Sequence, residues 1–300
     1  MSLLVTGGRG LVGSAIEADL KPTRDTLDLM DLDATVAYIE ANDVTEIIHC
    51  AAKVGGIKAN MEQLGEFFYA NMILNTNVLE AARKCGVTKM VSFMSTCVFP
   101  DDATYPLSAD QIHNGEPHPS NYAYAYAKRM LDVQSRAYRD QYGCNFVTVI
   151  PCNIYGPHDN FDLENSHVIP ALIRKCETAM EQDTEFVIWG SGKPWREFMY
   201  VGDVAEVATW VLNNYDSPVP FIMSPDEEVQ ISTIAQEIAT VMGFEGAIVY
   251  DDSYPDGQLK KPSDNSVLKQ HMPHFEFTSI QDGLKKAIDW YKANKKDVRS

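Results

Sequence analysis

The chain has 300 residues, 45% hydrophobic and 22% charged, which is typical of a globular protein with a large α/β domain and a smaller second one. Its net charge of −17 argues against nucleic acid or an anionic membrane as partner, although a local basic site for a small anion is still compatible. The six cysteines are scattered and no apolar run reaches membrane length. We therefore expect no disulfide, no metal, no signal peptide and a cytoplasmic location.

A glycine-rich segment follows the first predicted strand. Residues 3–5 are apolar, and Gly7, Gly10 and Gly13 then lead into a predicted helix with apolar residues as far as Leu20. A strand, a glycine turn and a helix in this order open a dinucleotide-binding βαβ unit, because the turn lets a pyrophosphate approach the helix N-terminus. The start of the chain therefore predicts a nucleotide cofactor.

The strand that usually follows this helix is missing or very short here. The acidic residue that usually ends that strand and binds the adenosine ribose is absent as well. Arg9 and Arg24 are available in its place. Two guanidinium groups at this position suit a 2′-phosphate, so we expect NADP rather than NAD. The alternative is that both arginines are solvated loop residues.

Predicted strands and helices then alternate as in a parallel sheet with crossover helices. Residues 1–157 should form a Rossmann-type NADP-binding domain, with segments returning from about 186–223, and residues 158–300 should mainly bind substrate. The fold class expected is α/β, a doubly wound parallel sheet with a smaller C-terminal α/β domain. The strands are predicted at 46–49, 89–94, 146–150 and 186–189, and the helices at 32–42, 66–84, 124–142, 202–213, 231–242 and 279–294.

Tyr124 and Lys128 stand four residues apart in one predicted helix, so their side chains share a face. A phenol has a reference pKa of about 10, and a neighbouring ammonium group is expected to lower it. Such a pair donates a proton to a nascent alkoxide or ketone oxygen. The alternative is a helix whose tyrosines pack and whose lysine reaches solvent.

Ser95 and Cys97 follow the strand at 89–94, at the strand end where ligands bind in open parallel sheets. The glycine turn, Ser95 and the Tyr124–Lys128 pair, in that order, resemble the extended short-chain dehydrogenase/reductase superfamily. Four longer motifs are similar to the GDP-L-fucose synthase family almost from end to end. These are residues 51–57 (AAKVGGI), 153–161 (NIYGPHDNF), 165–172 (NSHVIPAL), and 189–192 (WGSG) with 196–198 (REF).

The resemblance implies an NADPH-dependent enzyme that converts GDP-4-keto-6-deoxy-D-mannose to GDP-L-fucose by 3,5-epimerisation and 4-keto reduction. It implies Ser95, Tyr124 and Lys128 as the reductase triad, and Cys97 and His167 as the acid/base pair at C3 and C5. It implies a homodimer through the helices at 66–84 and 124–142. The cofactor residues implied are Gly7, Gly8, Arg9, Gly10, Leu11, Val12, Gly13, Arg24, Phe93, Met94, Ser95, Thr96, Lys128, Pro151, Cys152, Asn153, Ile154 and His167. The substrate residues implied are Asn153, Lys175, Trp189, Arg196, Lys260 and Lys261.

Elementary chemistry agrees with this assignment. Carbons beside a 4-keto group are acidified, so epimerisation needs only a base and an acid near neutral pH. Cysteine and histidine, with reference pKa values of about 8.5 and about 6.5, supply both. Alternatively, Cys97 is a small buried residue at a strand end and His167 lies beside a helix N-terminus.

Two other functions remain open at this point. One is another nucleotide-sugar epimerase, reductase or dehydratase of the superfamily. A dehydratase would carry an Asp-Glu pair after Thr96, where this chain has Cys97 and Val98. The other is a non-catalytic NADP sensor on the same fold, since fold alone does not decide function.

Overall fold

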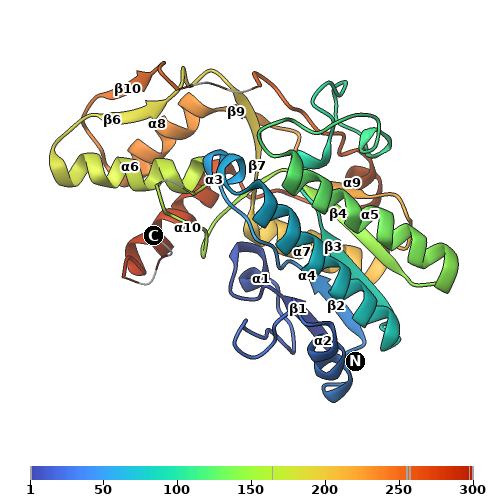
Figure 1. Cartoon of the computed structure of the whole chain (residues 1–300). Helices are drawn as coiled ribbons and strands as arrows, with labels where there is room; N and C mark the ends of the chain where they lie inside the picture. The colour runs from blue at the N-terminus through green and yellow to red at the C-terminus, as the bar shows by residue number, and fades with distance from the viewer. Residues whose placement is uncertain (1, 164, 255, 257, 297, 299–300) are drawn as a thin grey trace.

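A five-stranded parallel sheet is the centre of the computed structural model, which describes residues 2–163, 165–254, 256, 258–296 and 298 (Figure 1). The strand order is β1-β2-β3-β4-β8, and every neighbouring pair is parallel. All carboxyl ends of these strands therefore lie at one edge. The strands are β1 (Leu3–Thr6), β2 (Glu46–His49), β3 (Lys89–Phe93), β4 (Phe146–Pro151) and β8 (Phe221–Met223).

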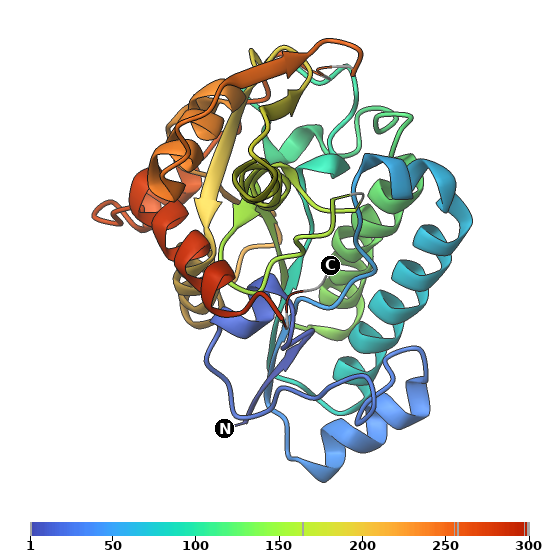
Figure 2. The same cartoon turned by 90° about the vertical axis from the view of Figure 1, so that its left-hand side faces the viewer.

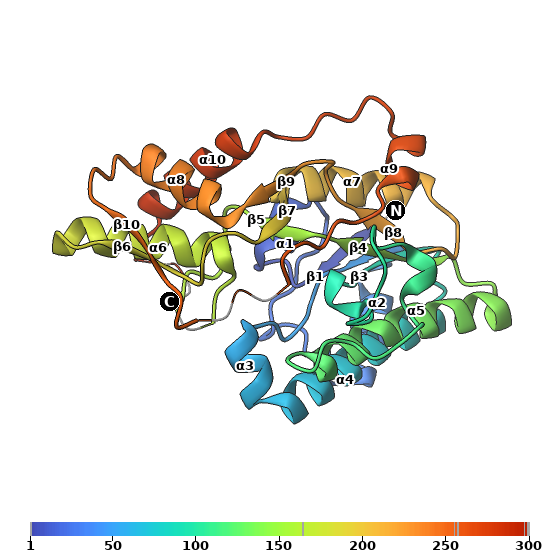
Figure 3. The ribbon, with the colours of Figure 1, turned by 90° about the horizontal axis from the view of Figure 1, so that it is seen from above.

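Both faces of this sheet are covered by helices (Figure 3). Leu4 packs with the helices on one face and its neighbour Val5 with those on the other, because successive strand residues point to opposite faces. With no solvated face, the strands read as continuous apolar runs. One face carries α2 (Leu32–Ala41), α4 (Leu64–Lys84) and α5 (Tyr122–Tyr142), and the other carries α1 (Leu11–Ala15), α7 (Val201–Asn214) and α9 (Ser266–His271).

A smaller C-terminal part has its own core and two small sheets (Figure 2). Its helices pack around buried side chains such as Ile173, Phe186 and Ile288. One sheet pairs β6 (Phe186–Trp189) with β10 (Ile248–Asp251), and the other has the order β5 (Asn153–Tyr155), β7 (Trp195–Tyr200), β9 (Glu228–Gln230). The helices are α6 (Val168–Gln182), α8 (Ile231–Met242) and α10 (Ile280–Ala293), and a short α3 (Ile57–Glu62) precedes α4.

The expected fold class is confirmed, and most predicted elements agree with the structure within a few residues. The α7 helix, β8 and α9 return to the large sheet, whereas β6 packs in the C-terminal core. The division near residue 157 stays a prediction. No helix in the described part of the chain combines the length and apolar character needed to cross a bilayer.

The first helix is shorter than predicted. It ends at Ala15, and Leu20 instead lies beside Leu4 in a single parallel bridge. Val5 N donates to Leu20 O at 2.9 Å, and Leu20 N donates to Leu3 O at 3.1 Å. The missing second strand is therefore reduced to one residue, which caps the edge of the sheet.

The glycine turn is packed too tightly to accept a side chain at its end. A Cβ on Gly13 would stand 2.3 Å from Gly7 O and 2.7 Å from Gly7 C, so the turn would have to move. Gly7 itself has φ 71°, in the left-handed region that glycine tolerates.

Gly13→Ala should lower the free energy of unfolding by roughly 1–3 kcal/mol, the usual cost of forcing atoms into a filled site. Gly65→Ala is the matched control, since a Cβ there meets nothing within 4 Å and alanine favours the helix. Urea unfolding of both variants tests the difference. Equal stability of the Gly13 variant and the parent would contradict the close packing of this turn.

Candidate active site

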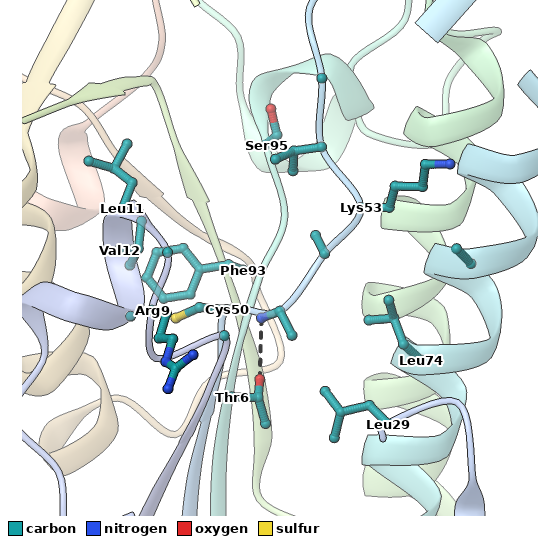
Figure 4. A pocket seen from close by; sticks show the side chains of 18 of the residues that line it. Thr6, Arg9, Leu11, Val12, Leu29, Cys50, Lys53, Leu74, Phe93 and Ser95 are labelled. Carbon is teal, nitrogen blue, oxygen red and sulfur yellow. Dashed lines mark hydrogen bonds between the residues drawn. The ribbon is translucent and has the colours of Figure 1, made fainter. Parts of the chain in front are cut away.

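One large cavity of about 1080 Å³ opens at the carboxyl ends of the parallel strands. Its lining combines the glycine turn, the loops after β2 and β3, the start of β5 and part of α5. All eighteen residues predicted from the sequence to bind the cofactor line it. Figure 4 shows Ser95 toward one end of the cavity and Arg9 and Leu29 toward the other.

A chain of hydrogen bonds runs from Thr6, in the cavity lining, through the buried His49 to Asn75 in α4. Ala51 N donates to Thr6 Oγ1 at 3.2 Å, the dashed contact of Figure 4. Thr6 Oγ1 lies 2.7 Å from His49 Nδ1, and His49 Nε2 lies 2.9 Å from Asn75 Oδ1. Burial and the nearby positive charge of Lys128 lower the pKa of His49 to about 3, so its ring is neutral at pH 7.

The two arginines predicted for a 2′-phosphate both line this cavity and both are exposed. Arg9 belongs to the glycine turn and Arg24 to the loop after Leu20. Among the described residues, neither guanidinium has an ion-pair partner. Both guanidinium groups are therefore available to an anion in this cavity, which Asp25 and Asp28 of the same loop as Arg24 also line.

Ser95, Tyr124 and Lys128 line the cavity together, as the order of the motifs suggested. Ser95 ends the loop from β3, and α5 presents Tyr124 and Lys128 one turn apart. The Lys128 Nζ donates to Phe93 O at 2.8 Å and lies 5.9 Å from the centre of the Tyr124 ring.

The expected lowering of the Tyr124 pKa is wrong. Burial raises the pKa of Tyr124 well above its usual range, and the nearby Cys97 adds to the rise. Burial likewise lowers the pKa of Lys128 to about 8. Loss of water around each side chain is the largest cause of both shifts. Tyr124 is a neutral phenol that keeps its proton.

The two residues assigned to proton transfer at C3 and C5 occupy different places. His167 lines the cavity, where it precedes the first residue of α6. Cys97 is not among the lining residues and lies in the short turn after Ser95, with Cys97 N 3.5 Å from Ser95 Oγ. Burial raises the pKa of the Cys97 thiol, and the charges of Lys261 and Lys128 partly oppose that rise.

The residues assigned to the substrate form two groups outside the cavity lining, apart from Asn153, which lines it. In one group, Lys175 Nζ lies 3.6 Å above the Trp189 ring, and Trp189 stacks on Tyr254 at 4.4 Å. Burial lowers the pKa of Lys175 to about 8. Trp189 exposes 48% of its surface, so this group presents an open aromatic and basic surface.

The second group surrounds Arg196. Lys261 is close enough to Arg196 and Cys97 for their charges to interact. Lys260 points differently, toward the Trp195 ring at 5.1 Å and Glu228 at 3.7 Å. The sequence left Lys260 and Lys261 as alternatives, and the structure brings only Lys261 to Cys97.

Sequence reasoning missed part of the cavity. Leu29, Leu74 and Asn160 line it without having been assigned a role. Leu29 and Leu74 come from a loop and a helix that lack any motif, so only their spatial proximity reveals them. No three or more His, Cys, Asp or Glu side chains within the described ranges are arranged to hold a metal ion.

Comparison with known proteins agrees with this geometry. The model of the NAD dependent epimerase/dehydratase family matches residues 3–223. The chain belongs to this family. It is 45% identical to the GDP-L-fucose synthase of Dictyostelium discoideum, with 99% of this chain and 97% of that protein covered. It is 43% identical to a probable GDP-L-fucose synthase of Drosophila melanogaster, with 99% of each covered.

A solved structure of a protein with a similar name also matches nearly the whole chain. The crystal structure of a GDP-L-fucose synthetase from Naegleria fowleri bound to NADP matches with a TM-score of 0.95 and 40% identity. The match covers 99% of this chain and 94% of that one. The likeness therefore includes both the large sheet and the C-terminal part.

The buried His49 should make stability depend on pH. Its pKa is about 3 when folded against 6.5 as the reference value, so its contribution is complete above pH 6.5 and declines as the pH falls toward 3. At pH 5.5 the parent should have lost about 1.4 kcal/mol through this group. Unfolding free energies at pH 7.5 and 5.5 for the parent and His49→Gln measure it. An equal pH dependence in both proteins would contradict the buried neutral ring.

Proposed function

We propose that this chain converts GDP-4-keto-6-deoxy-D-mannose to GDP-L-fucose with NADPH, by epimerisation at C3 and C5 followed by reduction of the 4-keto group. One observation carries the proposal: Tyr124, Lys128 and Ser95 lie in the same cavity as the glycine turn and His167. The relatives from Dictyostelium discoideum, at 45% identity, and Escherichia coli, at 34% identity, are GDP-L-fucose synthases, and each matches 99% of this chain.

The cavity suits a dinucleotide. A Cβ on Gly7 would stand 2.8 Å from Ala51 N, so the turn can lie against the loop after β2 at this end of the cavity only because this residue is glycine. The exposed Arg9 and Arg24 fit the 2′-phosphate of NADP. When bound, NADPH supplies the hydride for C4 of the sugar.

In the reduction, Tyr124 donates the proton that O4 needs. Its raised pKa keeps the phenol protonated until a stronger base, the alkoxide that forms at O4, takes the proton. Lys128 then stabilises the resulting phenolate, since it lies on the same face of α5. Ser95 holds the carbonyl oxygen from the loop after β3.

In the epimerisation, Cys97 and His167 remove and return protons at C3 and C5. Burial keeps Cys97 as a thiol, and the positive charges of Lys261 and Lys128 stabilise the thiolate when it forms. The ketone acidifies both carbons, so these weak acids and bases suffice. Arg196, Lys175 and Trp189 bind the GDP portion, where the basic groups offset the diphosphate charge.

The active form we propose is a cytoplasmic homodimer joined through α4 and α5. Large apolar side chains on these helices are exposed outside the cavity, among them Phe68, Val133 and Tyr142. A second copy of the chain would cover them. All six cysteines are free, which suits a reducing compartment.

Arg9→Glu should raise the KM for NADPH about tenfold or more, the factor for a lost charge-assisted hydrogen bond. The KM for NADH should change far less, because NADH has no 2′-phosphate. Initial rates with both cofactors measure the two constants, and NADH serves as the internal control. An unchanged ratio of the constants would remove Arg9 from recognition of the 2′-phosphate.

Tyr124→Phe and Cys97→Ser should separate the two chemistries. The first variant should stop net NADPH oxidation, yet substrate in deuterated water should still gain deuterium at C3 and C5. The second should lose exchange, because a serine hydroxyl is far too weak an acid to replace the thiol. His167→Gln should also depress exchange.

Mass spectrometry of the recovered sugar nucleotide measures all three variants. Undiminished deuterium uptake in both Cys97→Ser and His167→Gln would overturn the acid/base assignment. Exchange without any NADPH consumption by the parent would favour an enzyme that recycles its cofactor.

A further inference from the structure

Glu197 is a buried acid that the reaction does not use. It lies in β7 beside Arg196 and exposes only 5% of its surface. Its two carboxylate oxygens accept hydrogen bonds from Ser263, one from the backbone N at 2.8 Å and one from Oγ at 2.7 Å. Burial raises the pKa of Glu197, and these bonds oppose the rise. A costly buried carboxylate with two directed bonds indicates a positional role.

Ser263 belongs to an extended segment, residues 259–264, which we call the lysine strap. Trp195 N donates to Leu259 O at 2.8 Å, which fixes the start of the strap to β7. Leu107 N donates to Pro262 O and Asp264 N donates to Leu107 O, each at 2.8 Å. The strap therefore crosses from the C-terminal part to the loop after β3, and the Glu197 carboxylate is its side-chain anchor.

One lysine of the strap interacts through its charge with both Cys97 and Arg196, and no other lysine of the described residues does so. That residue is Lys261, two positions before the anchored Ser263. Lys260, its neighbour, lies instead over the Trp195 ring. Because the strap is held on both sides of these lysines, their directions depend on its attachment.

The backbone of Glu197 is bonded to a residue that lines the cofactor cavity. Asn153 Nδ2 donates to the backbone O of Glu197 at 2.9 Å, and Asn153 lines the cavity. The two strands are also paired, Asn153 opposite Phe198. One residue of β7 thus contacts both the wall of the cofactor cavity and the strap beside Cys97.

We infer that Glu197 is a positioning residue that holds the lysine strap so that Lys261 faces Cys97 during epimerisation. The inference rests on the proposed function, in which Cys97 moves protons at C3 and C5. Through Asn153 and Ser263, Glu197 keeps the epimerase groups in a fixed place relative to the cofactor cavity.

Several charges surround Cys97, and the strap supplies one of them. Lys128 and Arg129 come from α5, as does the phenol of Tyr124. Asp101 and Arg196 face Lys261 itself. Displacement of the strap removes the positive charge of Lys261 but leaves the α5 groups in place. Formation of the Cys97 thiolate then costs more, and exchange requires a higher pH.

The test compares Glu197→Gln, Ser263→Ala and the double variant with the parent. Ser253→Ala is the matched control, because Ser253 Oγ bonds Asp251 at 2.6 Å in an exposed turn of the same C-terminal part. Deuterium uptake at C3 and C5 is followed as a function of pH. NADPH affinity is measured by fluorescence and folding by thermal unfolding.

Glu197→Gln and Ser263→Ala should each slow exchange at pH 7 about tenfold or more, the factor for a lost hydrogen bond to a charged group. Both should move the midpoint of the pH profile upward. The double variant should be no worse than the Glu197 variant, because the Ser263 Oγ acts only through its bond to the Glu197 carboxylate. NADPH affinity should stay within about twofold of the parent, and Ser253→Ala should behave as the parent.

Parent-like exchange and an unshifted pH profile in Ser263→Ala would overturn the inference, even if Glu197→Gln fails to fold. So would additive losses in the double variant. Cys97→Ser in the same assay keeps the two hypotheses apart. If that variant exchanges as the parent does, the proposed function fails; if it loses exchange while Ser263→Ala does not, only the role of Glu197 fails.

Discussion

Parallel pairing of the five central strands is the constraint on which the rest of the molecule depends. Parallel strands place their carboxyl ends at one edge, and here that edge carries the glycine turn, the loop with Ser95 and the start of β5. Parallel strands also need crossover helices, which cover both faces and bury the sheet. The α5 helix is one of these crossovers, so packing alone brings Tyr124 and Lys128 to the same edge.

Burial then sets the chemistry of that edge. Burial shifts three pKa values in the direction that favours the uncharged side chain, those of Tyr124, Lys128 and His49. Loss of water is the largest cause in each case. At pH 7 Tyr124 and His49 are therefore neutral, whereas Lys128 keeps most of its positive charge because its pKa, about 8, lies above that pH. The phenol of Tyr124 becomes charged only when a substrate takes its proton.

The C-terminal part completes the site because the chain changes sheets within a few residues. After β4 ends at Pro151, the chain enters β5, which pairs with β7 in a different sheet. That pairing sets Asn153 beside the strand that carries Arg196 and Glu197. The N-terminus of α6 adds His167 to the cavity. Residues far apart in the sequence thus meet through the pairing of β5 with β7 and the N-terminal end of α6.

Much of this protein follows from the sequence alone. The glycine turn, the long apolar strands and the spacing of Tyr124 and Lys128 are local patterns, and local patterns predict the large sheet, its helices and most of the cavity lining. The family motifs around His167 and Arg196 added the substrate class. Short strands such as β5 and β9, at three residues each, carry too little periodicity to be predicted.

The tertiary structure decided what depends on distance and burial. The first helix ended early because Leu20 bonds the edge of β1, a contact that no local pattern encodes. Whether a phenol beside a lysine gains or loses acidity depends on the water around both, which is known only once the core is packed. The choice between Lys260 and Lys261 depended on how a strap is tied to Glu197, 66 residues away along the chain. Sequence specifies the groups, and packing specifies their partners.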